Sequence, residues 1–302
     1  MDTSLFEQIS SSLAVKAICG PLGPDIPAGT HLLSVEGLLD PGDDPNLDPL
    51  NNPSRVIDSN GQMVGILWFE NWGLEEEEAD PDASIVDDVM ERPEPFLSSD
   101  TTIVDAVELF GSTDSEVFYV IHINRVIGVL RYNDLFHPLG RLAFLALALE
   151  IEDLALGLCQ FAPVREDCWQ SISDNRKSKA IDVFKRRYGG EPNPKRDVAR
   201  LIECTNLVDK ANMIWKRQLI APASRADVLG FFHRLKEIRD QCAHPGVYGA
   251  LLAKEKLAHF VSSANRMRGS LRESMQNKGI SLVRRKAVTL VELGEHTPSG
   301  DF

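Results

Sequence analysis

A strand–turn–strand pattern that occurs twice in the first 136 residues most constrains the fold of this 302-residue chain. In the first copy, strand-like segments at 55–57 and 63–68 flank Ser59-Asn60-Gly61. Glycine tolerates the positive φ of a tight hairpin turn, so this tripeptide predicts the turn. The preceding segment 20–53 is rich in Pro, Gly and Asp, which is typical of loops around short elements.

The second copy begins with helical spacing of apolar residues at 102–110. Strands are expected at 117–123 and 126–130, with Asn124-Arg125 as the two-residue turn between them. A further helix is expected to begin within 132–136. The order helix, strand, turn, strand, helix predicts a small α/β unit, of which the first copy shows a shorter version.

Charge divides the chain into two unlike parts. Residues 1–136 hold 26 acidic and 5 basic residues, whereas residues 137–302 hold 19 acidic and 27 basic ones. The net charge of −13 therefore hides a basic half. This asymmetry predicts two units with different partners, and it makes RNA a candidate substrate of the basic half. The alternative is that the charges only keep the chain soluble.

The two copies together resemble a tandem pair of CBS domains. In the first copy the segment Val56–Leu67 carries the resemblance, and in the second copy the stretch from Val89-Met90 through Gly128–Leu135 carries it. The resemblance places the first copy at about 13–74 and the second at about 84–136. It implies α/β sandwich units that bind an adenine nucleotide (ATP, ADP or AMP) as a regulatory ligand.

The resemblance also implies a ligand site after the last strand, where the family has Ser/Thr-x-x-Asp for ribose and phosphate. Asp134 matches the family's Asp, and Arg131 replaces the Ser/Thr, where a guanidinium can bind phosphate directly. Trp68 and Asn71 stand at the matching positions of the first copy, so that site is altered. The acidic balance disfavours a polyphosphate. The alternative is a pair that only dimerises, with Asp134 capping the next helix.

From residue 137 onwards the sequence is predicted to be helical. Residues 139–161 are apolar on nearly all faces, which is typical of a central buried helix. Four further helices are expected at 174–188, 194–219, 223–242 and 247–272. Five helices joined by short loops predict an α-bundle over 137–275. The tail 276–302 contains strand-like segments at 280–283 and 287–293.

Arg239 and His244 form an arrangement that can support chemistry without a metal. Arginine can bind a phosphate through two parallel hydrogen bonds. A neutral histidine can take a proton from a ribose 2′-hydroxyl, or give one to a leaving oxygen, near pH 7. If the helix loosens at Ala243, ahead of Pro245, His244 can face the same pocket as Arg239. The two side chains would then suffice for RNA cleavage through a 2′,3′-cyclic phosphate, with no cofactor.

The motif Arg239-Asp240-x3-His244 between two long helices resembles the HEPN superfamily, in which it marks ribonucleases of toxin and defence systems. The resemblance implies that Arg239 binds the scissile phosphate, that His244 is the acid and base, and that Asp240 orients one of them. It also implies a homodimer whose two motifs share one cleft, and it leaves a neighbouring antitoxin partner open. The alternatives are a non-catalytic superfamily member and a chance pattern of a surface Arg–Asp pair with a capping histidine.

A basic cluster lies on the helix expected at 174–188. The side chains expected to follow RNA phosphates are Lys177, Lys185, Arg186 and Arg187. A solvated basic face is an equally good interpretation.

The five cysteines are an odd number without CxxC spacing, which predicts reduced thiols, no disulfide framework and no metal site. No signal peptide is visible, and the apolar run 139–149 is too short to span a bilayer. These features predict a cytoplasmic protein without a membrane partner.

The sequence therefore predicts an α+β protein, in which an acidic CBS pair at 1–136 precedes an all-α, HEPN-like bundle. The predicted function is that of a nucleotide-regulated, metal-independent endoribonuclease whose composite site forms between two subunits. The alternative is a non-catalytic regulator or scaffold that binds an adenine nucleotide or mediates dimerisation.

Overall fold

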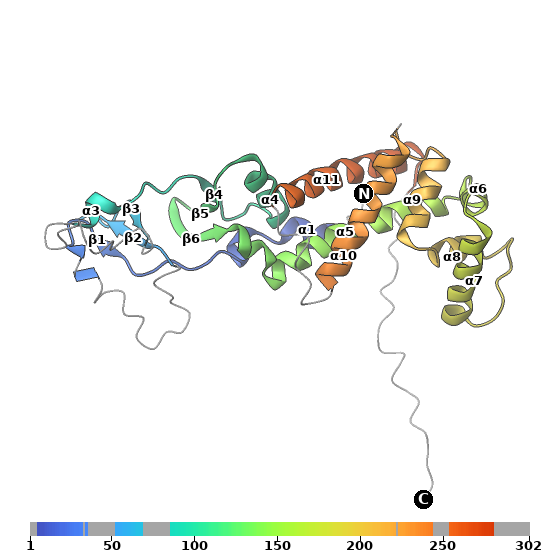
Figure 1. The fold of residues 1–302 in the computed structure, drawn as a ribbon, viewed down its shortest axis with the longest axis horizontal. Helices are drawn as coiled ribbons and strands as arrows, with labels where there is room; N and C mark the ends of the chain where they lie inside the picture. Colours follow the sequence, from blue (N-terminus) through green and yellow to red (C-terminus); the bar gives the residue numbers. More distant parts are fainter. Residues whose placement is uncertain are drawn as a thin grey trace, which may run out of the picture. The chain divides into compact units, whose positions relative to one another are not determined.

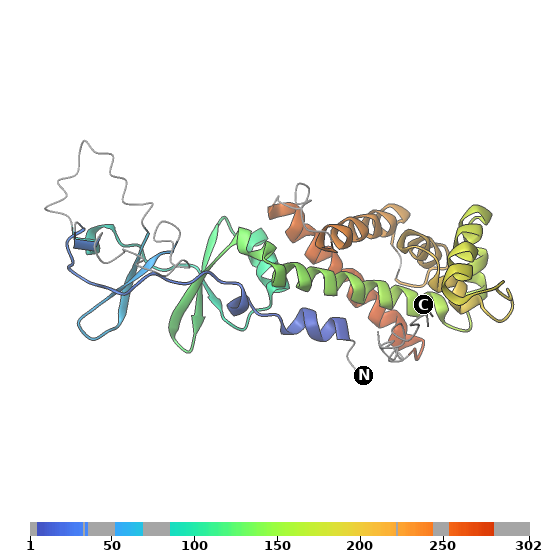
Figure 2. The same ribbon diagram turned by 90° about the horizontal axis from the view of Figure 1, so that it is seen from below.

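A computed structural model of the chain describes residues 5–32, 34–35, 52–68, 85–221, 223–243 and 254–280. The chain divides into two compact units (Figures 1 and 2). We call the part made of residues 6–152 and 224–268 the sheet unit, because it contains both β-sheets. The part made of residues 153–223 and 269–280 is called the helical unit. The domain boundaries expected from the sequence stay a prediction.

The sheet unit contains two three-stranded sheets of the same topology. The first consists of β1 (Ile26–Pro27), β2 (Ser54–Ile57) and β3 (Met63–Leu67), and the second of β4 (Phe96–Ser98), β5 (Val117–His122) and β6 (Arg125–Arg131). In each sheet the first two strands pair parallel and the last two pair antiparallel. The repeat expected from the sequence is therefore present in the strand pairing.

The two sheets also share an irregularity. Val56 lies opposite Gly65, and Val120 lies opposite Gly128, and the register shifts directly after each of these pairs. The shift leaves one extra residue in the last strand of each sheet, Val64 in β3 and its counterpart Ile127 in β6. Both extra side chains are exposed, at 41% and 40%. A bulge at the same position aligns the copies residue by residue, with Gly65 equivalent to Gly128.

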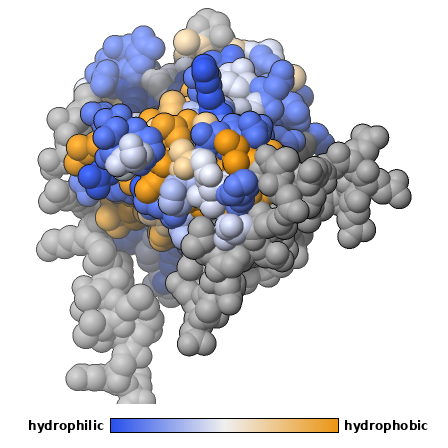
Figure 3. Space-filling model, turned by 90° about the vertical axis from the view of Figure 1, so that its left-hand side faces the viewer, coloured by the Kyte–Doolittle hydropathy of each residue, from blue (hydrophilic) through white to orange (hydrophobic). Residues whose placement is uncertain are grey.

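Each copy is crossed by the segment that leads into the other copy. Ile66 of β3 exchanges two backbone hydrogen bonds with Glu91, at 2.9 and 2.8 Å. Its counterpart Val129 of β6 exchanges two with Gly20, at 3.1 and 2.7 Å. These reciprocal crossings join the two sheets, because each leading segment is bonded to the opposite copy. Figure 3 views the molecule from the end of the first copy, where hydrophobic residues reach the surface between hydrophilic ones.

The two hairpin turns test the expectations from sequence. Gly61 has a φ of 74°, which confirms the turn in the first copy. In the second copy, the turn at Asn124-Arg125 is wrong by one residue. The residues between the strands are Ile123 and Asn124, with φ of 45° and 60°. This two-residue turn needs positive φ at both central positions, and Asn124 meets that need better than Arg125.

The same unit also contains helices, one of which, at 86–89, packs on the first sheet through Val86. They are α1 (Leu5–Ser12), the 3-10 helix η1 (Val15–Ala17), α3 (Val86–Val89), α4 (Ile103–Ser112), the 3-10 helix η3 (Tyr132–Phe136), the first part of α5 (Pro138–Gln160), α10 (Arg225–Ala243) and most of α11 (Lys254–Asn277). Helix α4 approaches α11 closely, since a Cβ added at Gly111 would clash with the Cβ of Ala258. The Nζ of Lys254 donates to the carbonyls of Thr113 and Ser115, both at 2.8 Å, and so places a cation just after the C-terminal end of α4.

The helical unit contains α6 (Arg165–Gln170), α7 (Asp174–Tyr188), α8 (Val198–Glu203) and α9 (Leu207–Lys216). Helix α7 ends before Gly189, which has a φ of 68°, as the sequence predicts. The single helix expected at 194–219 is wrong, because Asn206 starts a new helix. Its side chain accepts the backbone N–H of Asp209 at 2.8 Å and caps α9.

No helix among the described residues is long and apolar enough to cross a membrane. The strand-like tail segments at 280–283 and 287–293 lie almost entirely outside the described residues.

Candidate functional site

Arg131 and Asp134 lie together where β6 passes into η3. The carboxylate of Asp134 accepts the backbone N–H of Arg131 at 2.7 Å, so one of its oxygens caps η3. Burial raises the pKa of Asp134 above its ordinary value and outweighs that hydrogen bond and the charges of Arg131 and His137, which lower it. The capping contact is the one that the alternative left open for Asp134 predicts, and ligand binding by these two residues stays a prediction.

The guanidinium of Arg131 rests on an aromatic side chain of the other copy. Its Cζ lies 5.3 Å from the ring centroid of Trp68, a cation–π contact. Among the described residues, no carboxylate forms an ion pair with this guanidinium. The guanidinium of Arg131 therefore has an aromatic neighbour, and its charge interacts with the nearby carboxylate of Asp134.

Trp68 is itself held by the second copy. Its Nε1–H donates to the hydroxyl oxygen of Tyr119 on β5 at 2.7 Å, and the two ring centroids lie 6.4 Å apart. Tyr119 is 3% exposed, and burial raises the pKa of its hydroxyl. The indole thus joins the end of the first sheet to the middle strand of the second.

The leading segment of the first copy passes beside these residues. A Cβ added at Gly20 would lie 3.9 Å from Nη1 of Arg131. Cys19 is half-buried, and burial raises the pKa of its thiol, with the negative charge of Asp134 contributing to the same shift. The residues around Arg131 therefore come from both copies.

The family comparison bears on this region. Residues 86–140 match the family model described as the CBS domain. The chain contains a CBS domain. Because residues 14–68 repeat its strand pairing, register and bulge, the N-terminal region has a CBS-type α/β fold built from two copies. Arg131 and Asp134 both lie inside the matched CBS domain.

Solved structures with weak overall similarity also contain CBS domains. A CBS domain protein of unknown function from Thermoplasma acidophilum is 20% identical, with 44% of this chain and 75% of that chain covered and a TM-score of 0.32. The CBS domain of a bacterial CNNM/CorC family Mg²⁺ transporter in complex with ATP is 12% identical, with 42% and 86% covered and a TM-score of 0.31. CBSX2 in complex with AMP is 18% identical, with 41% and 92% covered and a TM-score of 0.29. No curated protein matches the chain.

Arg239, on the last turns of α10, is enclosed by carboxylates. Its Nη1 lies 2.8 Å from Glu152 of α5, and its Nη2 lies 3.1 Å from Asp240. Lys236 adds a contact with Asp240 at 3.4 Å. Arg239 and Asp240 do pair although they are neighbours on one helix, because the long arginine side chain folds back to the carboxylate. Both an orienting role for Asp240 and the alternative of a surface Arg–Asp pair require this contact, so the role of Asp240 stays a prediction. The position of His244 lies outside the described residues, so its convergence with Arg239 stays a prediction.

The basic residues of α7 are mostly engaged with acidic or amide groups. Lys185 lies 2.6 Å from Glu191, and Arg187 lies 3.2 Å from Glu203. Lys177 contacts the side-chain oxygen of Gln170 at 3.1 Å, and Arg186 donates to the carbonyl of Asp182. All these contacts are near the surface, where such pairs contribute little and exchange readily. RNA binding by this helix stays a prediction.

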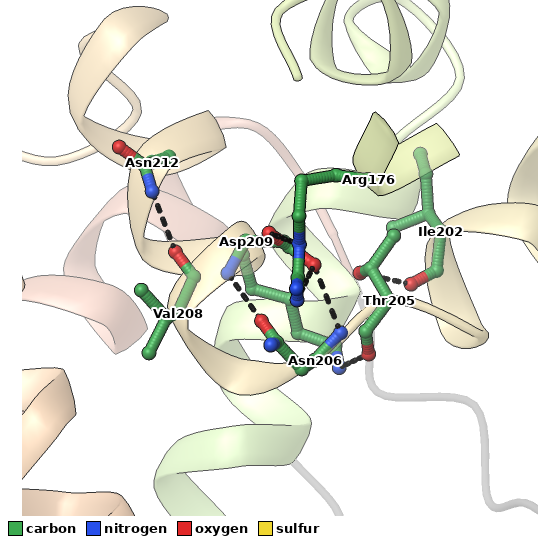
Figure 4. Close-up of polar contacts among 8 residues, drawn as sticks. Arg176, Ile202, Thr205, Asn206, Val208, Asp209 and Asn212 are labelled. Carbon is green, nitrogen blue, oxygen red and sulfur yellow. Dashed lines mark hydrogen bonds and ion pairs between the residues drawn. The ribbon is translucent and has the colours of Figure 1, made fainter. Parts of the chain in front are cut away.

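Arg176, on the same helix, has a structural contact. Its Nε and Nη2 each donate to one oxygen of Asp209 at 2.8 Å, while Asp209 also accepts from the backbone of Asn206 (Figure 4). Asp209 is only 6% exposed. The pair connects α7 to α9, so Arg176, a further basic residue of this helix, is not available to a nucleic acid.

Sequence reasoning noted Trp68 only as a departure from the family motif. It missed Tyr119 and the contacts that Trp68 makes with Tyr119 and Arg131. The available signal was an aromatic residue at the end of one hairpin and an arginine at the same position of the other.

Proposed function

We propose that this chain is a regulatory protein whose CBS pair binds an adenine nucleotide beside Arg131 and Asp134. The observation that supports the proposal is the Asp134 carboxylate at the end of β6, which accepts the backbone N–H of Arg131 and interacts with the charge of its guanidinium, inside the matched CBS domain. The second oxygen of Asp134 has no hydrogen-bond donor among the described residues, and it suits a ribose hydroxyl. Arg131 suits a phosphate.

Charge favours a ligand with few phosphates. Residues 1–136 carry an excess of acidic over basic residues, and this field opposes a polyphosphate more than a monophosphate. AMP is therefore the expected first ligand, and ADP and ATP are expected to bind more weakly.

Thermal unfolding with AMP, ADP and ATP tests the proposal. AMP is expected to raise the melting temperature of the wild-type protein, because a ligand that binds only the folded state stabilises it. Asp134→Asn keeps an oxygen that can accept the Arg131 N–H but removes the charge, and it is expected to reduce the shift. Asp227→Asn is the matched control, since Asp227 takes part in the cap of α10 through Ser224 and lies far along the chain from Arg131. Equal shifts in both variants, or none in the wild type, would contradict the proposal.

We propose ribonuclease activity as a second function of the helices around Arg239. It rests on the motif Arg239-Asp240-x3-His244, and the contact of Asp240 with Arg239 fits both an orienting role for Asp240 and the alternative of a surface Arg–Asp pair. Three of the five N–H groups of Arg239 are engaged by Glu152 and Asp240, so a phosphate would have to compete with these carboxylates for the guanidinium. Two subunits would each contribute an Arg239 and a His244.

Cleavage of varied RNAs without added metal tests this second function. The wild-type protein is expected to leave 2′,3′-cyclic phosphate ends, and His244→Ala is expected to be inactive while still folded. Light scattering is expected to show a dimer. Equal activity of wild type and His244→Ala, or a strict monomer, would refute the composite site.

A further inference from the structure

The register of the two sheets makes Trp68 the counterpart of Arg131. Gly65 and Gly128 are equivalent through the shared bulge, and Trp68 and Arg131 each follow their glycine by three residues. The two copies therefore present different side chains at the same structural position. One is a cation suited to phosphate, and the other is a bulky indole.

Trp68 fills its position with protein atoms. Its indole packs against a cluster of Ile66, Tyr119, Val126 and Val129, which joins β3, β5 and β6. The hydrogen bond from Nε1 to Tyr119 satisfies the only polar atom of the ring. Arg131 covers the indole face at 5.3 Å. A ligand could enter this position only by displacing a side chain that is packed, hydrogen-bonded and covered.

The cations of the first copy are also engaged. Lys16 lies 2.7 Å from Asp100, and Arg55 donates to both oxygens of Asp25, at 2.6 and 2.9 Å. These two are the basic residues between 13 and 74. A phosphate in the first copy would have to compete with these carboxylates, whereas at Arg131 it meets a guanidinium without an ion pair among the described residues.

We propose that the two copies bind one nucleotide between them, at Arg131 and Asp134, and that Trp68 closes the equivalent position of the first copy. The inference rests on the proposed nucleotide binding and gives that site its stoichiometry. Trp68 then serves as a wall of the single site, because its indole face lies against the guanidinium that receives the phosphate. Phosphate binding at Arg131 changes the environment of this indole.

Isothermal titration calorimetry of the wild-type protein with AMP tests the stoichiometry. One AMP per chain is expected. Arg131→Gln is expected to weaken binding by about 10- to 100-fold, since a charge-assisted hydrogen bond to phosphate is lost. Arg55→Gln, the control in the first copy, is expected to leave affinity within about twofold. Two AMP molecules per chain, or an equal loss in both variants, would overturn the inference while leaving nucleotide binding intact. No binding of any nucleotide would refute the proposed function and this inference together.

Tryptophan fluorescence provides a second readout. AMP is expected to change the emission of the wild-type protein and of Trp169→Phe, whose indole lies in the helical unit. The change is expected to be lost in Trp68→Phe, which keeps an aromatic ring at the position. A full emission change in Trp68→Phe would place the nucleotide away from this wall and overturn the inference.

Discussion

Gly128 permits the segment at Gly20, which leads into the first copy, to cross β6 of the second copy. Replacing Gly128 is expected to weaken the backbone hydrogen bonds of this crossing. A Cβ at this position would lie 2.5 Å from the carbonyl oxygen of Gly20 and 2.9 Å from Sγ of Cys19. Because the first of these atoms is backbone, the leading segment has to move, and both hydrogen bonds between Gly20 and Val129 weaken. Two such bonds contribute about 1 kcal/mol each, and crowding adds about 1 to 2 kcal/mol. Gly128→Ala is therefore expected to lower the free energy of unfolding of the sheet unit by about 3 kcal/mol.

Two further glycines set the scale for this measurement. At Gly65 the added Cβ meets the side chain of Met90, which is flexible, so Gly65→Ala is expected to cost only about 1 kcal/mol. At Gly230, inside α10, nothing lies within 4 Å, and Gly230→Ala is expected to stabilise the protein by up to about 1 kcal/mol. Urea unfolding followed by circular dichroism measures all three. A Gly128→Ala variant as stable as wild type would refute the reasoning about the crossing.

Three other expectations follow from individual contacts. Arg176→Met is expected to lower the free energy of unfolding, measured in urea, by about 2 to 4 kcal/mol, because it removes the arginine that pairs with the buried carboxylate of Asp209. Lys179 is exposed on the same helix, so the control Lys179→Met should change the free energy of unfolding by less than about 0.5 kcal/mol. Iodoacetamide at pH 8 is expected to label the half-buried Cys19 before Cys242, because burial raises the pKa of the Cys242 thiol to about 11. AMP is expected to slow the labelling of Cys19. Mass spectrometry that finds Cys242 labelled first would contradict this order. The raised pKa of Asp134 means that its carboxyl group binds a proton more tightly in the folded state than in the unfolded state, so the protein becomes more stable as the pH falls through the folded pKa. Asp134→Asn removes the charge, so its gain in melting temperature over wild type should be largest at pH 7 and vanish near pH 3. A gain that is the same at every pH would be inconsistent with this reasoning.

Local signals in the sequence predicted much of the fold. Gly61 and Gly189 stand at positive φ where a turn and a helix end were expected, and Ser224 caps α10 through Asp227. These features depend on a few neighbouring residues, so their chemistry is visible in sequence. The error at Ile123 shows the limit of this reasoning, since an exposed isoleucine at positive φ is unfavourable locally and is imposed by the pairing of β5 with β6.

The contacts that make the candidate site depend on residues distant in sequence. Trp68 is 51 residues from Tyr119 and 63 from Arg131, and only the aligned bulges of the two sheets show that it occupies the counterpart position. Likewise, Glu152 meets Arg239 across 87 residues because α5 and α10 pack within the sheet unit. Motif spacing predicts roles for Arg131, Asp134 and Arg239, but it could not supply the partners that determine how their charges are used.

Hydrogen–deuterium exchange of the full chain, with and without AMP, tests most directly whether the nucleotide binds where β6 meets η3. Slower exchange is expected in peptides spanning 125–136, which include the Arg131 N–H that donates a hydrogen bond to the Asp134 carboxylate. No change is expected in peptides spanning 165–188 of the helical unit. AMP binding with unchanged exchange over 125–136 would contradict this location.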